Sequence, residues 1–373
     1  MNEDPEQVDV SKECDLIKDT SNDSCPHDVA SDNDVTANAV SKGNSVMDVI
    51  ADLSPLSFTI NQEKKELKGE DADPLLLTIG DIGYIGVFDG MGGAGASEYA
   101  MPDGLKHTGA YLASRLVASL MTEFVTNNPT CDIDVNLLCQ FIKERLNQYA
   151  VDNNIKPSGL RSSIIRVLPT TLSVIGYRRV GTQLDINSYW CGDSRNYYMT
   201  KEGLKQISID DLKTIQDPME NLRNDEALSN CICQDKEFSI NKINVGKISL
   251  PAILFSATDG CFGYLETPMH FEYLLLDTLM CSHNIDEWKS NIIETLKPIS
   301  GDDFSMAVTM IGLEFDSWKE QMKSRYQTMQ SVYVEAIRKL HSDSEQQIKD
   351  AEDKLYNGIT ELWNNYKINY LNQ

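Results

Sequence analysis

The stretch Val87-Phe88-Asp89-Gly90-Met91-Gly92-Gly93 decides how this chain is interpreted. Two apolar runs, at 75–79 and 84–88, precede it and predict buried strands. The second run ends at a single carboxylate, Asp89, and a glycine-rich turn follows at once. Glycine allows the backbone to come close to a ligand. Because Asp-Gly pairs are also common in ordinary turns, the meaning of this one depends on the rest of the chain.

Further carboxylates lie where other strands are predicted to begin or end. They belong to the segments Gly192-Asp193-Ser194-Arg195, Thr258-Asp259-Gly260 and Gly301-Asp302-Asp303, and the pair Glu70-Asp71 precedes the strand runs that lead to Asp89. Hard divalent cations such as Mg²⁺ and Mn²⁺ prefer oxygen ligands. Carboxylates that converge at one sheet edge could hold two such ions, which would activate water for attack on a phosphoryl group.

Net charge, apolar runs and cysteine content limit which partners and which compartment are expected. The 373 residues carry a net charge of −24, which argues against nucleic acid or an anionic membrane surface as the main partner. The sequence shows no signal segment and no apolar run of about 18 residues, so no membrane span is predicted. The nine cysteines are scattered and odd in number, which favours thiols in a reducing compartment and a cytoplasmic location.

Three segments differ in character. Residues 1–54 are acidic and contain no Phe, Trp or Tyr, so we expect a disordered tail. Residues 55–314 show the patterns of a folded domain. Residues 315–373 keep helical spacing and predict a helical hairpin or a long broken helix. This last segment could pack on the domain, or it could be an arm for self-association or for a protein partner.

Helix and strand patterns are mixed within the folded domain. Apolar spacing predicts helices over 112–124, 138–149 and 268–297. Segments rich in β-branched and aromatic residues predict strands at 56–60, 171–177, 184–191, 195–199, 252–257 and 304–313. Residues 208–235 are polar and predict a surface flap. The pattern indicates an α+β protein.

The motifs carry a resemblance when they are taken together. Their order, Glu-Asp, Asp-Gly-Met-Gly-Gly, Gly-Asp-Ser-Arg, Thr-Asp-Gly and Gly-Asp-Asp, resembles that of the metal-dependent Ser/Thr protein phosphatases, the PPM or type 2C class, in their bacterial form. The resemblance covers residues 55–313. It implies an αββα four-layer sandwich of two antiparallel sheets flanked by helices, here with a C-terminal helical extension. It also implies hydrolysis of phosphoserine or phosphothreonine in a protein substrate by direct attack of metal-bound hydroxide.

The resemblance further implies two Mg²⁺ or Mn²⁺ ions and a weaker third. Asp89 would bridge the two ions and would be catalytic, and Gly90 would lend its carbonyl oxygen. Glu70 would serve the second ion, with Asp71 close behind through water.

The remaining motifs complete the implied ligand set. Asp259, also catalytic, and Asp302 would hold the first ion, and Asp193 would hold the third together with Asp259. The pair Thr170-Thr171 resembles a threonine pair of the family and is expected to be structural, and Asp303 is assigned no ligation.

The sequence departs from the family pattern near the substrate. The family usually has an arginine five residues before Asp71 to bind the substrate phosphate, and this chain has Glu66 there. Candidate substitutes are Lys65, Lys68, Arg161 and Arg166. Met91 stands where eukaryotic members have a histidine. Two alternatives therefore stay open, a non-catalytic binding or scaffold module of the same fold and a phosphohydrolase with a small-molecule substrate.

Overall fold

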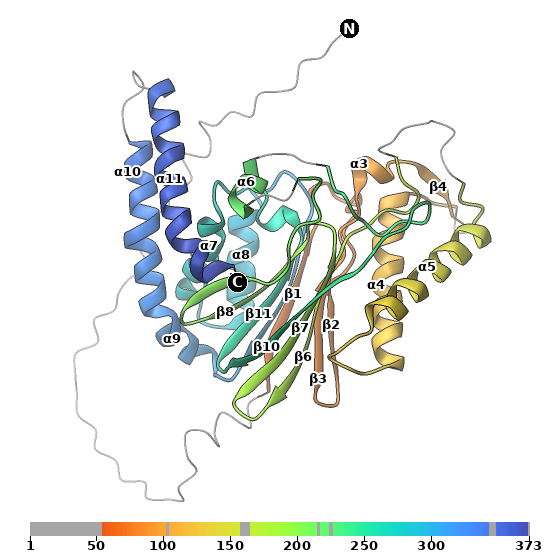
Figure 1. The fold of residues 1–373 in the computed structure, drawn as a ribbon, viewed down its shortest axis with the longest axis horizontal. Coiled ribbons are helices and arrows are strands. Elements are labelled where there is room, and N and C mark those ends of the chain that lie inside the picture. Colours follow the sequence, from red (N-terminus) through yellow and green to blue (C-terminus); the bar gives the residue numbers. More distant parts are fainter. Residues whose placement is uncertain are drawn as a thin grey trace, which may run out of the picture.

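The computed structural model of the chain describes residues 54–101, 104–156, 165–214, 217–223, 227–342 and 348–371 (Figure 1). The predicted acidic tail, apart from Ser54, lies outside these ranges, and so does Arg161. In the part of the chain that is described, no helix has both the length and the apolar character needed to cross a membrane.

Two five-stranded sheets form the centre of the molecule. The first sheet has the strand order β1 (Leu56–Gln62), β12 (Phe304–Ile311), β11 (Ala252–Ala257), β8 (Arg195–Thr200) and β9 (Gly203–Gln206). The second has the order β10 (Asn241–Ser249), β7 (Gln183–Cys191), β6 (Leu172–Val180), β3 (Ile82–Val87) and β2 (Leu75–Ile79). Every neighbouring pair is antiparallel. The predicted pair of antiparallel sheets is thereby confirmed.

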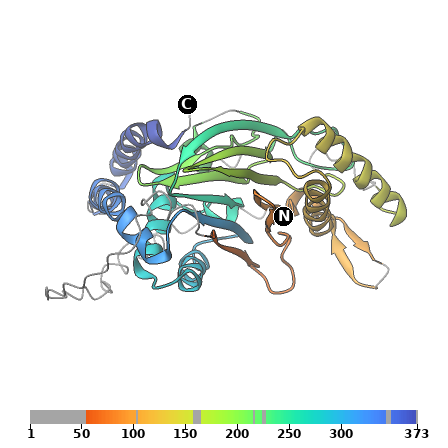
Figure 2. The same cartoon turned by 90° about the horizontal axis from the view of Figure 1, so that it is seen from below.

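Helices cover the outer face of each sheet. The second sheet carries α4 (Gly109–Asn127) and α5 (Val135–Asp152), and the first carries α7 (Pro268–Cys281) and α8 (Ile285–Leu296) (Figures 1 and 2). The layers therefore follow the order helix, sheet, sheet, helix. Shorter elements complete the domain, namely α3 (Gly92–Gly95), the hairpin strands β4 (Glu98–Ala100) and β5 (Lys106–Thr108), α6 (Pro218–Arg223) and the 3-10 turn η1 (Asp259–Cys261).

The central strands are apolar throughout because their successive side chains enter two different apolar cores. On β3, Tyr84 packs toward the helices of the second sheet, whereas Ile85 packs between the two sheets. On β11, Phe255 faces the helices of the first sheet and Leu254 lies between the sheets. Neighbouring side chains point to opposite faces of a sheet, and both faces of these central strands are covered, so β3 and β11 are buried along their whole length. The edge strand β10 instead alternates between less and more exposed residues.

The C-terminal segment is helical and packs on the first sheet. Helix α9 (Phe315–Thr328) continues through a π-helical segment, η2 (Met329–Val334), into α10 (Glu335–His341), and α11 (Ile348–Tyr370) follows (Figure 1). Trp363, Tyr366 and Tyr370 of α11 are each at most 2% exposed and share one apolar core with the first sheet. The predicted C-terminal helices are confirmed, and they contribute to the core of the domain.

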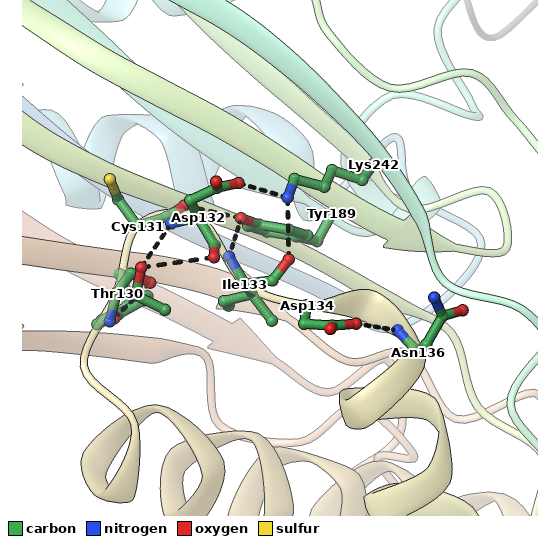
Figure 3. Close-up of polar contacts among 9 residues, drawn as sticks. Thr130, Cys131, Asp132, Ile133, Asp134, Asn136, Tyr189 and Lys242 are labelled. Carbon is green, nitrogen blue, oxygen red and sulfur yellow. Dashed lines mark hydrogen bonds and ion pairs between the residues drawn. The ribbon is translucent and has the colours of Figure 1, made fainter.

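The loop between α4 and α5 is attached to the second sheet by polar contacts (Figure 3). The hydroxyl of Tyr189, on β7, donates to the carbonyl oxygen of Cys131 and accepts from the nitrogen of Ile133, each over 2.7 Å. Lys242, on β10, donates to the carbonyl oxygen of Ile133 at 3.0 Å and pairs with Asp132. These contacts fix the position from which α5 begins, with Asp134 as its N-cap.

Candidate active site

Strand register brings the predicted carboxylates to one end of the sandwich. In the second sheet, Val87 pairs with Ser173 and Leu172 pairs with Cys191, so Asp89 and Asp193 follow strand ends on the same side. In the first sheet, Ala257 pairs with both Met306 and Arg195. The segments that carry Asp259, Asp302 and Asp193 therefore leave that sheet at one end as well.

The carboxylates at this end of the sandwich interact electrostatically. Burial raises the pKa of Asp89 well above its ordinary value, and the charges of Asp71, Asp259, Asp193 and Asp302 raise it further. Like charges that lie close together disfavour simultaneous ionisation. The site therefore concentrates negative charge, and a nearby cation would relieve the repulsion.

The pKa values of Asp71 and Asp259 are raised as well. Burial and the charge of Asp259 raise the pKa of Asp71 to about 8, despite a hydrogen bond from Thr258 Oγ1 to Asp71 Oδ2 at 3.1 Å. Burial and the charge of Asp302 raise the pKa of Asp259, while a hydrogen bond with Asp89 opposes that rise. Asp89 and Asp259 come from different sheets, so this hydrogen bond joins the two halves of the sandwich at the site.

Asp193 lies at the same end, between β7 and β8. Burial raises its pKa well above the ordinary value, and the charges of Asp259 and Asp210 add to the effect. Next to it, Arg195 is buried and makes a bidentate ion pair with Asp210, with Nε–Oδ1 at 2.9 Å and Nη2–Oδ2 at 2.6 Å. A bidentate pair fixes the orientation of both partners, so the turn that carries Asp193 has a rigid support.

Helix α4 supports Glu70 through residues that the sequence did not single out. Thr108 Oγ1, at the N-cap of α4, donates to Glu70 Oε1. Ser114 Oγ donates to the carbonyl oxygen of Glu70 at 2.5 Å, and Arg115 Nη1 and Nη2 donate to the carbonyl oxygens of Glu70 and Gly69, both at 3.2 Å. A helical pattern does not reveal such contacts, because they depend on where the helix lies in the fold.

Asp303, to which no ligation was assigned, is a second supporting residue. Its Oδ2 accepts from the backbone nitrogen of Glu70 at 2.7 Å, and its Oδ1 accepts from the backbone nitrogen of Lys64 at 2.7 Å. Asp303 thereby ties the Gly-Asp-Asp segment to the Glu-Asp segment.

The threonine pair holds the backbone of Asp89. Thr171 N and Thr170 Oγ1 both donate to the carbonyl oxygen of Asp89, at 2.8 and 2.6 Å, and the nitrogen of Asp89 donates to Thr171 Oγ1 at 3.2 Å. This agrees with the structural role expected for the pair.

At two glycines of the motifs, the backbone of another motif passes so close that there is no room for a side chain. A Cβ built on Gly90 would lie 2.5 Å from the carbonyl oxygen of Glu70, and one built on Gly260 would lie 1.9 Å from the carbonyl oxygen of Asp303. Both neighbours are backbone atoms that cannot turn away. Only glycine therefore allows the motifs to approach one another as closely as they do.

The candidates for phosphate binding are distributed around this end. Lys65, Glu66 and Lys68 are exposed in the turn after β1, and neither lysine has an ion-pair partner among the described residues. Arg166 is partly exposed, and its backbone nitrogen donates to the carbonyl oxygen of Ala94 in α3 at 3.0 Å. Arg115, which was not among the predicted candidates, donates its guanidinium to the backbone carbonyls of Glu70 and Gly69.

The donor chemistry fits a hard divalent cation. The site offers carboxylate and carbonyl oxygens, and burial, together with the charges of neighbouring carboxylates, raises the pKa of Asp89 and Asp193. Among the described residues, however, no three His, Cys, Asp or Glu side chains are already gathered as the ligands of one ion. Binding would therefore require the carboxylates to reorient, beginning with the hydrogen-bonded pair Asp89 and Asp259.

Comparison with solved structures identifies the fold. A variant of a bacterial serine phosphatase matches 70% of this chain and 98% of its own, with 16% sequence identity and a TM-score of 0.50. The serine/threonine phosphatase Stp1 from Staphylococcus aureus matches 74% and 99%, with 17% identity and a TM-score of 0.48. PstP/Ppp from Mycobacterium tuberculosis matches 70% and 100%, with 14% identity and a TM-score of 0.47.

The chain has the αββα fold of the bacterial serine phosphatases, as the order of its motifs predicted. No protein-family model matches the sequence, and a comparison with curated protein sequences also finds no match.

Proposed function

We propose that this chain is a metal-dependent protein phosphatase of the PPM type that hydrolyses phosphoserine or phosphothreonine. The observation that carries the proposal is the convergence of carboxylates from five separate segments at one end of a sandwich with the fold of bacterial serine phosphatases. The proposed metal-binding residues are Glu70, Asp71, Asp89, Gly90, Asp193, Asp259 and Asp302, with Asp89 and Asp259 as the catalytic pair.

Mg²⁺ or Mn²⁺ held by these residues, as two ions and a weaker third, would supply charge neutralisation of the phosphate and a water of lowered pKa. The chain's own groups set the geometry. Thr170 and Thr171 fix the backbone at Asp89. Asp303 and the N-terminal turn of α4 fix Glu70. Position 91 is methionine, so the histidine of the eukaryotic enzymes is not available as an acid. We infer that the leaving oxygen of the substrate takes its proton from water.

We propose that a lysine substitutes for the arginine that the family has at the position of Glu66, with Arg161 and Arg166 as the other candidates. Lys65 and Lys68 are exposed and lie close to Glu70 in the sequence, which makes their ammonium groups the proposed phosphate contacts. Lysine acts as a point charge and lacks the bidentate fork of arginine. We therefore expect weak binding of the phosphate, and Lys65→Ala or Lys68→Ala should raise KM more than it lowers kcat.

The test is hydrolysis of p-nitrophenyl phosphate by the full chain with Mn²⁺, with Mg²⁺ and with chelator. We expect activity that requires the metal and that falls by at least about 100-fold in Asp89→Asn and in Asp259→Asn. Asp81→Asn is the matched control, because Asp81 is an exposed carboxylate paired with Arg178 on a turn away from the site. Full activity in Asp89→Asn would contradict the proposed function.

Two alternatives are separated by further measurements. Glu66 in the phosphate-binding position motivates a non-catalytic scaffold of the same fold, and absence of divalent-ion binding in calorimetry would favour it. A small-molecule phosphohydrolase would hydrolyse nucleotides or sugar phosphates in preference to phosphopeptides.

We propose that the protein works in a reducing compartment. The cysteines in the described ranges are free thiols, which agrees with a cytoplasmic enzyme that acts on a phosphorylated protein. The C-terminal helices offer a surface for a protein partner or for a second copy of the chain, although the side of α11 that carries Trp363 is already covered by the domain.

A further inference from the structure

The turn between β1 and β2 presents an apolar side chain in an unusual way. Leu67 is 90% exposed and its φ is +60°. The left-handed region costs a residue with a side chain about 1–2 kcal/mol, and turns usually place glycine or asparagine there. A leucine at such a position gains nothing from burial, so neither packing nor turn chemistry explains it.

The turn is rigidly held. Leu67 N donates to Glu63 Oε2 at 2.6 Å, and Lys68 N donates to the carbonyl oxygen of Lys65 at 3.0 Å. The start of the turn is attached to the candidate site itself, because Lys64 N donates to Asp303 Oδ1. Asp303 also holds the backbone of Glu70. The leucine is therefore presented on a preorganised turn that shares its support with the site.

Position and charge indicate what would contact Leu67. It lies three residues before Glu70, so the two Cα atoms are at most about 11 Å apart. The exposed residues Lys64, Lys65 and Lys68 flank it in the sequence, on a chain whose net charge is −24. A phosphopeptide that places its phosphate at the carboxylate end would bring a residue next to the phosphorylated one within reach of this turn.

We propose that Leu67 is a specificity contact, which packs against an apolar side chain one or two residues from the phosphoserine or phosphothreonine of the substrate. The proposal rests on the phosphatase function proposed above and names its substrate class, phosphopeptides with an apolar residue beside the phosphate. Backbone strain that is retained at a functional position is explained when it presents a side chain to a ligand.

The experiment uses the full chain and a set of phosphothreonine peptides. They are identical and alanine-rich except for one leucine, placed in turn at each of the two positions on either side of phosphothreonine. The readout is the ratio of kcat/KM for each leucine peptide to kcat/KM for the all-alanine peptide. We expect at least one peptide to reach a ratio of about 5 to 10 with the wild type, as partial burial of one leucine provides.

Variants then assign that preference to Leu67. Leu67→Asn keeps a residue that tolerates the left-handed region but removes the apolar contact, so the ratio should fall to about 1. Leu137→Ala removes another exposed leucine, 58% exposed on α5, and should keep the wild-type ratio. No leucine preference in the wild type, or the same preference in Leu67→Asn, overturns the contact. Absence of metal-dependent p-nitrophenyl phosphate hydrolysis overturns the phosphatase function instead.

Discussion

The backbone nitrogen of Glu70 donates a 2.7 Å hydrogen bond to Oδ2 of Asp303, which lies 233 residues further along the chain. The other carboxylate oxygen of Asp303 accepts from Lys64 N. One side chain therefore sets the position of the Glu-Asp segment and of the turn that leads into it. Residues that orient ligands of a metal commonly affect metal affinity as strongly as some ligands do.

Asp303→Ala should accordingly weaken metal binding. Loss of both acceptor oxygens frees the backbone of Glu70, and we expect the Mn²⁺ concentration for half-maximal activity to rise about 10-fold. Asp303→Asn keeps one acceptor oxygen, so its Mn²⁺ concentration for half-maximal activity should lie between those of the wild type and Asp303→Ala. Activity titrated against Mn²⁺ measures this. An unchanged titration in Asp303→Ala would show that the hydrogen bond to Glu70 has no bearing on the metal.

Divalent cations should stabilise the folded chain. A bound cation would relieve the repulsion among Asp89, Asp193 and Asp259. A ligand at 100 times its Kd adds about 2.7 kcal/mol to the free energy of unfolding. For a chain of this size we expect Tm to rise by about 4 °C. Thermal unfolding with Mn²⁺ and with chelator measures it, and Asp259→Asn should reduce the rise.

Helix α11 should be indispensable for stability. Trp363 is 2% exposed and contacts Tyr366 and Tyr370 in the core of the first sheet. Trp363→Ala should lower the free energy of unfolding by about 3–5 kcal/mol. Ile368→Ala, on the same helix but 77% exposed, should change it by less than about 0.5 kcal/mol. Urea unfolding compares the two, and equal effects would contradict the packing described for this helix.

A buried ion pair joins α9 to α7. Arg325 Nε and Nη2 contact Glu272 Oε1 and Oε2 at 2.5 and 3.0 Å, and the Glu272 side chain is fully buried. Arg325→Leu leaves that carboxylate without its partner and should destabilise the fold by about 3–5 kcal/mol. The double variant with Glu272→Leu should recover most of the loss. A double variant that is additive in urea unfolding would mean that the two groups do not interact.

His270 should make the fold sensitive to mild acid. Burial, with the charges of His341 and Arg338, lowers the pKa of His270 below its ordinary value, although the charge of Glu266 opposes this. As the pH falls below about 6.5, the unfolded chain binds a proton that folded His270 resists, so the free energy of unfolding decreases.

A pH series of urea unfolding curves checks this effect. His270→Gln should flatten the slope of the free energy of unfolding between pH 7 and 5.5, whereas His283→Gln, at a side chain 82% exposed, should keep it. A slope that is the same in all three proteins would exclude His270 as its source.

Local pattern predicted much of this fold because the signals are local. Four-residue spacing predicted α4 through Leu112, Leu116 and Leu120, and the helix is present from Gly109 to Asn127. The strand from 304 to 313 ends two residues earlier than predicted, at Ile311, and a positive φ at Gly312 follows it. The hairpin of β4 and β5 has no such pattern, because three-residue strands carry almost no periodicity.

From the sequence alone, Asp89 could be recognised as a carboxylate that follows a buried strand and opens a glycine-rich turn. Its order of motifs was enough to indicate the αββα fold. The packed structure was needed to show that the backbone of Glu70 leaves no room for a side chain at position 90, and that Asp303, Thr108 and Arg115 support the site. Those contacts join segments far apart in the chain, and their distances exist only once both sheets have packed.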